Sequence, residues 1–166
     1  MTDSLVRSIV DTFGSGNTKE LVVFVISMIP ILELRGSILA AGLMNMNFLS
    51  AYIISVLGNI IPVPFILLFI DKIFALMKKT RLKGFVEKLE RKALSKSDQI
   101  KRYGSLGLYL FVAVPLPGTG AWTGALIASM LRLEKKRCIL FIFLGILTAG
   151  LIMSIISFGA LKNILY

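Results

Sequence analysis

Two short stretches of this 166-residue chain combine residue types that could bind or move a charged group. The first is ELRG, residues 33–36, in which an acid and a base lie two positions apart between apolar runs. Arg35 could bind an anion through its planar guanidinium, while Glu33 could carry a proton. Residues two apart do not share a helical face, so these side chains are neighbours only if the chain is irregular there. The alternative is a buried ion pair that only stabilises its surroundings.

The second stretch, VPLPGTGAWTG, runs from Val114 to Gly124 and carries no charge. Pro115 and Pro117 each lack a backbone donor, and the glycines that follow permit conformations that other residues avoid. A continuous helix cannot pass through such a stretch. In a membrane the freed backbone groups need partners in the protein or in a water-filled cavity, so the stretch predicts a break that serves a site.

The residues after these prolines could form an anion-binding cradle. A helix that begins there directs its positive end at the break, together with the backbone N–H groups of Gly118, Thr119 and Gly120. We expect Thr119 or Thr123 to cap this helix. The alternative is a tight turn that needs prolines and glycines only to fit. Trp122 could stack on a substrate, although packing is the commoner role of a lone tryptophan.

A further polar residue, Asn59, interrupts the apolar run from Phe48 to Ile70 together with Pro62 and Pro64. Asn59 could contribute to a binding site at mid-membrane depth. Alternatively, it hydrogen-bonds a neighbouring helix while the prolines kink its own.

The composition indicates an integral membrane protein with a single membrane domain, residues 1–166. Hydrophobic residues make up 56% of the chain, and the mean hydropathy is +0.84. The net charge of +10 is local, because residues 72–102 hold eleven Lys or Arg against three acids. Next to an apolar span, such a cluster marks the cytoplasmic side and does not indicate nucleic-acid binding.

Cysteine and histidine usage excludes several kinds of chemistry. The chain has one cysteine, Cys138, and no histidine. A disulfide framework, a cysteine metal cluster, and Ser-His or Cys-His catalysis are therefore excluded within one chain. We expect neither an enzyme nor a bound cofactor or metal.

The apolar runs predict an all-α fold in which one plan occurs twice, an interrupted segment followed by an intact span. The expected elements are an interfacial helix in 1–19, a helical hairpin in 21–47, a transmembrane helix in 48–70, a basic connector in 71–102, a second hairpin in 103–131 and a transmembrane helix in 138–161. The connector has apolar residues at helical spacing, Leu82, Phe85, Val86, Leu89 and Ala93. It is either an amphipathic helix bound to anionic lipid headgroups or a solvated linker.

The basic clusters predict that the second hairpin is re-entrant. Residues 71–102 and 132–137 are both basic, and both are cytoplasmic only if residues 103–131 enter the membrane and return to the same side. By symmetry, we expect 21–47 to enter from the opposite face, giving an inverted repeat whose tips meet near the midplane. The expected structural residues of the tips are Pro30, Gly36, Pro115 and Pro117.

Three stretches resemble the putative small multidrug export protein family: MIPILELRGSILAAGL, SVLGNIIPVPFILLFI and VAVPLPGTGAWTGALIAS. The plan is also similar to the wider DedA, or VTT-domain, superfamily, which pairs an acid in its first hairpin with a Pro/Arg/Gly-rich motif in its second. Glu33 matches the acid. The arginine of the second motif has no counterpart in PLPGTGAWTG, so we expect Arg35 to supply the charge from the other hairpin.

The resemblance implies a transporter in the cytoplasmic (inner) membrane of a prokaryote. DedA-like proteins include ion-coupled transporters of polyprenyl phosphates, which would make the substrate an amphiphilic anion such as a lipid-linked phosphate. Arg35, Gly118, Thr119, Gly120, Asn59 and Trp122 would then bind it, and Glu33 would couple transport to the ion gradient. The alternatives are a proton-coupled exporter of cationic drugs and a non-transporting scaffold or scramblase-like protein. Membrane lipids are the expected partners, and a homodimer would suit so small a bundle.

Overall fold

The computed structural model describes residues 18–116 and 118–165, of which residues 160–165 are described without their side chains. This part of the chain consists of helices and short connections, with no strand in it. The interfacial helix predicted within residues 1–19 and the tip residue Pro117 fall outside the described residues. The helices are α2 (Lys19–Met28), α3 (Glu33–Leu43), α4 (Phe48–Ile60), α5 (Pro62–Met77), α6 (Lys83–Leu94), α7 (Asp98–Ala113), α8 (Ala121–Met130) and α9 (Lys135–Leu165).

The chain divides into two compact units. The first contains the chain up to Ile61 and from Ile146 onward, and the second contains Pro62–Gly145. Helix α4 therefore belongs to the first unit and α5, which follows it directly, to the second. Helix α9 contributes to both units in turn.

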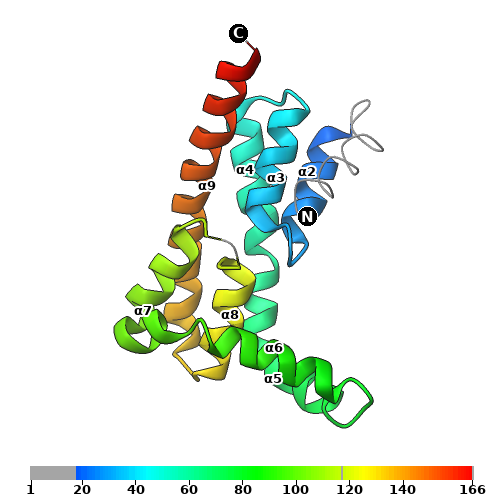
Figure 1. Ribbon diagram of the computed structural model, residues 1–166, viewed down its shortest axis with the longest axis vertical. Helices are drawn as coiled ribbons and strands as arrows, with labels where there is room; N and C mark the ends of the chain where they lie inside the picture. The colour runs from blue at the N-terminus through cyan, green and yellow to red at the C-terminus, as the bar shows by residue number, and fades with distance from the viewer. Residues whose placement is uncertain (1–17, 117, 166) are drawn as a thin grey trace. The chain divides into compact units, whose positions relative to one another are not determined.

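The first unit contains the predicted hairpin as two antiparallel helices, α2 and α3, packed against α4 (Figure 1). At the open end of the pair, Lys19 donates from Nζ to the carbonyl oxygen of Met44 over 2.8 Å. Small and branched apolar side chains fill the space between these helices. The buried core consists of Val23, Ile26, Leu32, Ala40, Ala41, Met44, Met46 and Ala51.

Helix α4 approaches α2 closely because Gly58 has no side chain. A Cβ at this position would collide with the Oγ of Ser27 and lie 2.8 Å from the carbonyl oxygen of Phe24. The last part of α9 packs on the other side of α4, where Gly150 lies against the ring of Tyr52. The Tyr52 hydroxyl donates to the carbonyl oxygen of Leu147 at 3.2 Å. Small residues thus allow close helix packing, as is usual in membrane proteins.

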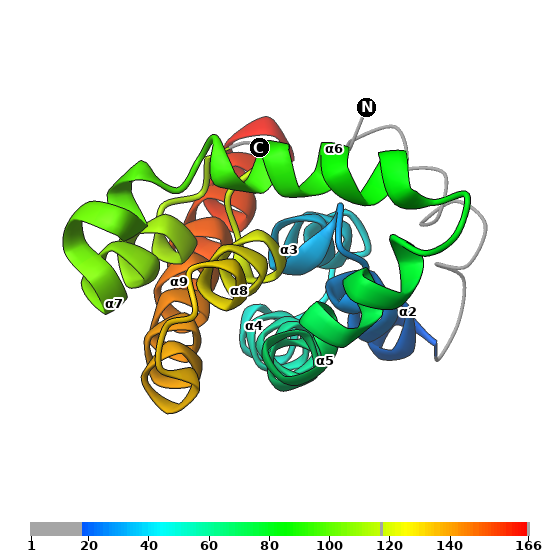
Figure 2. The same ribbon diagram turned by 90° about the horizontal axis from the view of Figure 1, so that it is seen from below.

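The second unit combines α5, α6, α7, α8 and the start of α9. Figure 2 shows α6 along its length, crossing the line of α5. Helix α6 packs against α5 and α8, and α8 packs against both α5 and α7. Gly124 of α8 and Gly145 of α9 both lie against Val112 of α7, so small residues again set the spacing.

Helix α7 is longer than predicted and is bent. The second hairpin was expected to begin at residue 103, but α7 begins at Asp98 and turns sharply at Gly104, whose φ is +57°. This left-handed conformation favours glycine. After the bend the chain folds back, and a Cβ at Gly107 would collide with the carbonyl oxygen of Gln99. The bend depends on two glycines, Gly104 and Gly107, so the periodicity of the apolar residues could not predict its position.

The connector also differs from its predicted bounds. Residues 71–102 were expected to be one polar segment, but α5 continues through Asp71 to Met77 before the chain turns to α6. The amphipathic helix exists as α6, yet only Val86 and Ala93 of its expected apolar stripe are buried. Leu82 and Phe85 are exposed.

Two apolar helices are long enough to cross a membrane. Residues Phe48–Met77 form the first, which contains α4 and α5, and Lys135–Gly159 form the second. Both predicted spans therefore correspond to candidate membrane-spanning helices: the first extends beyond 48–70 to Met77, and the second begins earlier than 138–161, at Lys135, and ends at Gly159. Just before Pro62, the hydrogen bond from Ile61 N–H to the carbonyl of Leu57 is long, at 3.4 Å, and the predicted kink at the prolines stays a prediction.

We expect Gly58→Ala to destabilise the protein by about 1–3 kcal/mol, because the added methyl group overpacks the contact between α4 and α2. The matched control is Gly84→Ala in α6, where a Cβ meets no atom within 4 Å. That substitution should leave stability unchanged or raise it by up to about 1 kcal/mol through helix propensity. Thermal unfolding in detergent measures both, and equal melting temperatures would contradict the close packing at Gly58.

Candidate functional site

The connection between α2 and α3 places a charged residue in an unusual backbone conformation. Glu33 begins α3 with a φ of +48°, and only 6% of its surface is exposed. The left-handed region costs a non-glycine residue roughly 1–2 kcal/mol. The chain is therefore irregular at Glu33, which is the condition under which residues two apart, Glu33 and Arg35, can be neighbours. Backbone strain at a buried acid is typical of functional sites.

Arg35 follows on the first turn of α3 and is half-buried. The charges of Glu33 and Arg35 interact electrostatically, as their spacing around an irregular turn allows. The two differ in accessibility, because the carboxylate is buried whereas the guanidinium is partly exposed. A molecule that approaches this part of the first unit can therefore reach the positive charge more easily than the negative one.

Gly36 keeps this turn compact. A Cβ on Gly36 would lie 2.8 Å from the Cβ of Leu32, so a larger residue would push the turn apart. Pro30 lies in the connection and is exposed. The two residues expected to shape the first tip are therefore both at the turn.

Buried polar side chains accompany the charged pair. Ser27, at the end of α2, donates from Oγ to the carbonyl of Phe24 at 2.6 Å, and Ser37 donates to the carbonyl of Leu34 at 2.9 Å. Asn59 is 2% exposed, and its neighbour Gly58 lies against Ser27, so Asn59 is at the level of the turn. The predicted hydrogen bond from Asn59 to a neighbouring helix is not found for its Oδ1, which has no partner among the described residues.

In the second unit, the VPLPGTGAWTG stretch forms the connection between α7 and α8. Thr119 organises it: its hydroxyl donates to the carbonyls of Val114 at 3.0 Å and Leu116 at 2.8 Å, and its N–H donates to Leu116 at 3.1 Å. Gly118 and Gly120 have φ values of +76° and +143°, which explains why glycines stand at both positions. The break in the helix is confirmed.

One detail of the predicted cradle is wrong. The N–H of Thr119 donates to the carbonyl of Leu116, so it does not join Gly118 and Gly120 in presenting donors to an anion. The N-cap of α8 is Gly120, and Thr123 lies inside the helix on its first turn. The Thr119 hydroxyl donates to carbonyls of the turn that precedes the helix.

Lys96 adds a positive charge to this connection that the sequence did not reveal. Its ammonium group donates to the carbonyl oxygen of Gly118 at 3.0 Å. Lys96 precedes α7, and the bend at Gly104 brings the two segments together within the unit. Pro115 and Trp122 lie on either side of the turn, both half-buried. No sequence pattern pointed to Lys96, because it is one of many lysines in the basic connector.

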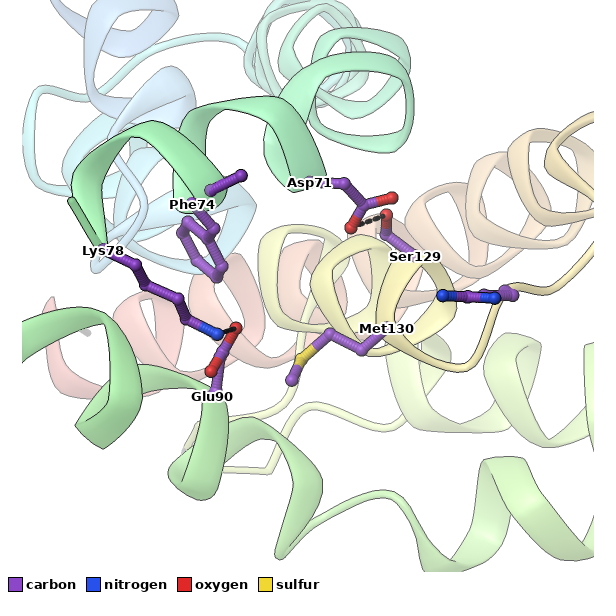
Figure 3. A pocket seen from close by; sticks show the side chains of 8 residues that line it. Asp71, Phe74, Lys78, Glu90, Ser129 and Met130 are labelled. Carbon is purple, nitrogen blue, oxygen red and sulfur yellow. Dashed lines mark hydrogen bonds and ion pairs between the residues drawn. The ribbon is translucent and has the colours of Figure 1, made fainter. Parts of the chain in front are cut away.

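A cavity of about 400 Å³ lies elsewhere in the second unit, between α5, α6 and the end of α8 (Figure 3). Asp71 accepts a hydrogen bond from Ser129 at 3.0 Å, and Lys78 pairs with Glu90 at 2.7 Å across the opening. In the sequence, the only indication that Asp71 could line a cavity is its position at the end of an apolar run. The cavity lining consists of Asp71, Phe74, Ala75, Lys78, Glu90, Ser129, Met130 and Arg132.

The described residues include no group of three or more His, Cys, Asp or Glu side chains that could hold a metal ion. The predicted site residues fall into two sets. Glu33, Arg35 and Asn59 belong to the first unit, and Gly118, Thr119, Gly120 and Trp122 belong to the second.

Comparison with known protein families shows to which family the chain belongs. Residues 33–152 match the family described as "Putative small multi-drug export protein". The chain belongs to this family. The match begins at Glu33 and contains both ELRG and PLPGTGAWTG, so the chemistry-bearing stretches lie within the family region. No curated protein and no solved structure matches the chain. The similarity to the DedA superfamily stays a prediction.

Membership in this family, together with the two long apolar helices, indicates a membrane protein with candidate membrane-spanning helices. The family description names multi-drug export, which is the coarser form of the alternative function considered above. Glu33 and Arg35 stand at the start of the family region, and Asn59 and the α7–α8 connection lie inside it.

Thr119 provides a local test of the α7–α8 connection. We expect Thr119→Val to lower stability by about 0.5–1.5 kcal/mol, because the hydroxyl hydrogen that is shared between the carbonyls of Val114 and Leu116 is lost. Thr119→Ser keeps the hydroxyl and should retain most of the stability. Thr123→Val, on the first turn of α8, is the matched control. Thermal unfolding of the purified variants gives the answer, and equal loss in the Val and Ser variants would show that the hydroxyl does not hold the turn.

Proposed function

We propose that this protein is a membrane transporter that moves an amphiphilic anion, such as a lipid-linked phosphate, and that this movement is coupled to an ion gradient. The observation that carries the proposal is the unequal burial of one charged pair: Arg35 is partly exposed, whereas Glu33 is buried. An arginine guanidinium binds phosphate or carboxylate through parallel hydrogen bonds. The accessible charge of this pair therefore suits an anionic headgroup.

The same pair supplies a means of coupling. Charged side chains deep in a membrane are stable only when paired or neutralised. While Arg35 faces Glu33, the two charges balance; when an anion takes over Arg35, the carboxylate loses that balance and gains a proton more readily. Proton uptake at Glu33 would thus accompany substrate binding at Arg35. This coupling requires no residue beyond the ELRG turn.

Export of small cationic drugs is the second candidate, and the family description favours it. In that mechanism Glu33 itself exchanges a proton for a cation. The buried position of Glu33 and its electrostatic interaction with Arg35 weigh against direct contact with a cation. The charge of the transported molecule separates the two candidates.

Helix lengths support re-entrant hairpins in both halves of the chain. Helices α2, α3 and α8 have 10, 11 and 10 residues. At about 1.5 Å per residue each extends roughly 15 Å, half of the hydrocarbon thickness of a bilayer. Such helices fit a segment that enters the membrane and turns back. The exposed Leu82 and Phe85 beside the lysines of α6 fit a helix on an anionic, cytoplasmic membrane surface.

Substitutions at the charged pair test the substrate. In proteoliposomes, we expect Arg35→Gln to reduce uptake of an amphiphilic phosphate at least tenfold, while Glu33→Gln keeps uptake but loses its dependence on the pH gradient. Glu20→Gln, an exposed acid of α2, is the control. If Arg35→Gln leaves phosphate uptake intact and Glu33→Gln instead abolishes export of a lipophilic cation, the second candidate holds.

Single-cysteine labelling tests the re-entrant topology. With Cys138→Ala as background, cysteines at the exposed positions Lys79 and Lys136 should both react from the cytoplasmic side. They flank the second hairpin, so reaction from opposite sides would mean that α7 and α8 cross the membrane. A cysteine at the exposed Asn45, between α3 and α4, is the control and should react only from the other side.

A further inference from the structure

The end of α4 carries oxygen atoms that the protein itself does not satisfy. Ser55 Oγ and Asn59 Oδ1 are both buried and have no hydrogen-bond partner among the described residues. The two residues are four positions apart and therefore lie on the same face of α4. Leaving such an atom buried without a partner costs about 1–3 kcal/mol in a protein.

The backbone at the same place adds further free acceptors. Pro62 has no N–H, so the helical hydrogen bond to the carbonyl of Gly58 cannot form, and Pro64 removes the equivalent donor for Ile60. The bond from Ile61 N–H to Leu57 is stretched to 3.4 Å.

This group of oxygens lies at the centre of an apolar span. Asn59 follows Phe48 by eleven residues in the 30-residue helix Phe48–Met77. At about 1.5 Å per residue it is roughly 16 Å from the start of the span, close to half of the hydrocarbon thickness. Neither the described residues nor hydrocarbon offers these oxygens a hydrogen-bond donor. A bound ion or molecule could satisfy them.

We propose that Ser55 Oγ, Asn59 Oδ1 and the Gly58 carbonyl oxygen bind a dehydrated alkali cation, Na⁺ or K⁺, at the end of α4. Oxygen ligands can replace the hydration shell of such a cation, and broken helices in transporters use freed carbonyls in this way. The ligands are neutral, whereas Mg²⁺ and Ca²⁺ sites use carboxylates. The Ser27 hydroxyl, which lies against Gly58, is placed to add a fourth oxygen.

The nearby charges permit a cation. Helix α4 has no charged residue, and the opposite charges of Glu33 and Arg35 interact with each other, which limits their net field. Any part that this cation plays in transport, in addition to the proton at Glu33, rests on the proposed function, but the binding of the cation does not. Cation binding would be a property of α4, separate from the anion that Arg35 is proposed to hold.

The test is the melting temperature of the purified full-length protein in NaCl, KCl or choline chloride at equal ionic strength. Na⁺ or K⁺ at ten times its Kd should raise the melting temperature by roughly 3–6 °C relative to choline. We expect Asn59→Ala and Ser55→Ala to lose this shift. Ser50→Ala, an exposed serine of the same helix, should keep it.

The alanine variants could lose the shift simply because they fail to fold. We therefore add Asn59→Asp, whose carboxylate should tighten cation binding, and measure that binding with a radioactive alkali cation. Equal melting temperatures in all three salts, or a shift that survives in Asn59→Ala, would overturn the proposal. Arg35→Gln should keep the cation shift. A cation shift without gradient-driven uptake would refute the transport function and leave the cation site standing.

Discussion

A bilayer interior offers no hydrogen-bond partner, and the architecture of this chain follows from that constraint. Wherever proline or glycine interrupts a helix, the freed backbone groups have to be satisfied from within the protein. Between α7 and α8 the Thr119 hydroxyl and the Lys96 ammonium group perform this task. At the end of α4 the donors are absent among the described residues, and an oxygen-rich site remains. The need to satisfy these groups thus gives a turn with internal hydrogen bonds in the second unit and a candidate binding site in the first.

Close helix packing is the second requirement, and glycine meets it in both units. Gly58 brings α4 against α2, Gly150 brings α9 against Tyr52, and Gly145 brings the start of α9 against Val112. Lipid tails are as apolar as leucine, so helices in a membrane gain more from close backbone approach than from burying apolar surface. These contacts hold the short helices, which are too short to span a membrane alone, beside longer ones.

The charged pair of the ELRG turn connects this architecture to function. Glu33 is held in a left-handed conformation and buried, while Arg35 remains partly accessible. A chain that only needed an ion pair for stability could place it on a regular helix at a spacing of four. The strained turn instead separates the two groups by exposure, which is the basis of the proposed division of roles between an anion-binding arginine and a charge-balancing acid. The description of the family names multi-drug export.

The sequence alone determined the membrane class, the two long spans, the breaks at ELRG and PLPGTGAWTG, and the family, because hydropathy, proline and glycine act locally along the chain. It also predicted an irregular backbone at Glu33, since residues two apart cannot meet on a helix. Tertiary structure alone decided which donors satisfy the breaks. The Thr119 hydroxyl donates to the carbonyls of Val114 and Leu116, Lys96 reaches the carbonyl of Gly118, and Asn59 Oδ1 has no partner among the described residues. These outcomes depend on which segments lie side by side, and residue order does not encode that directly.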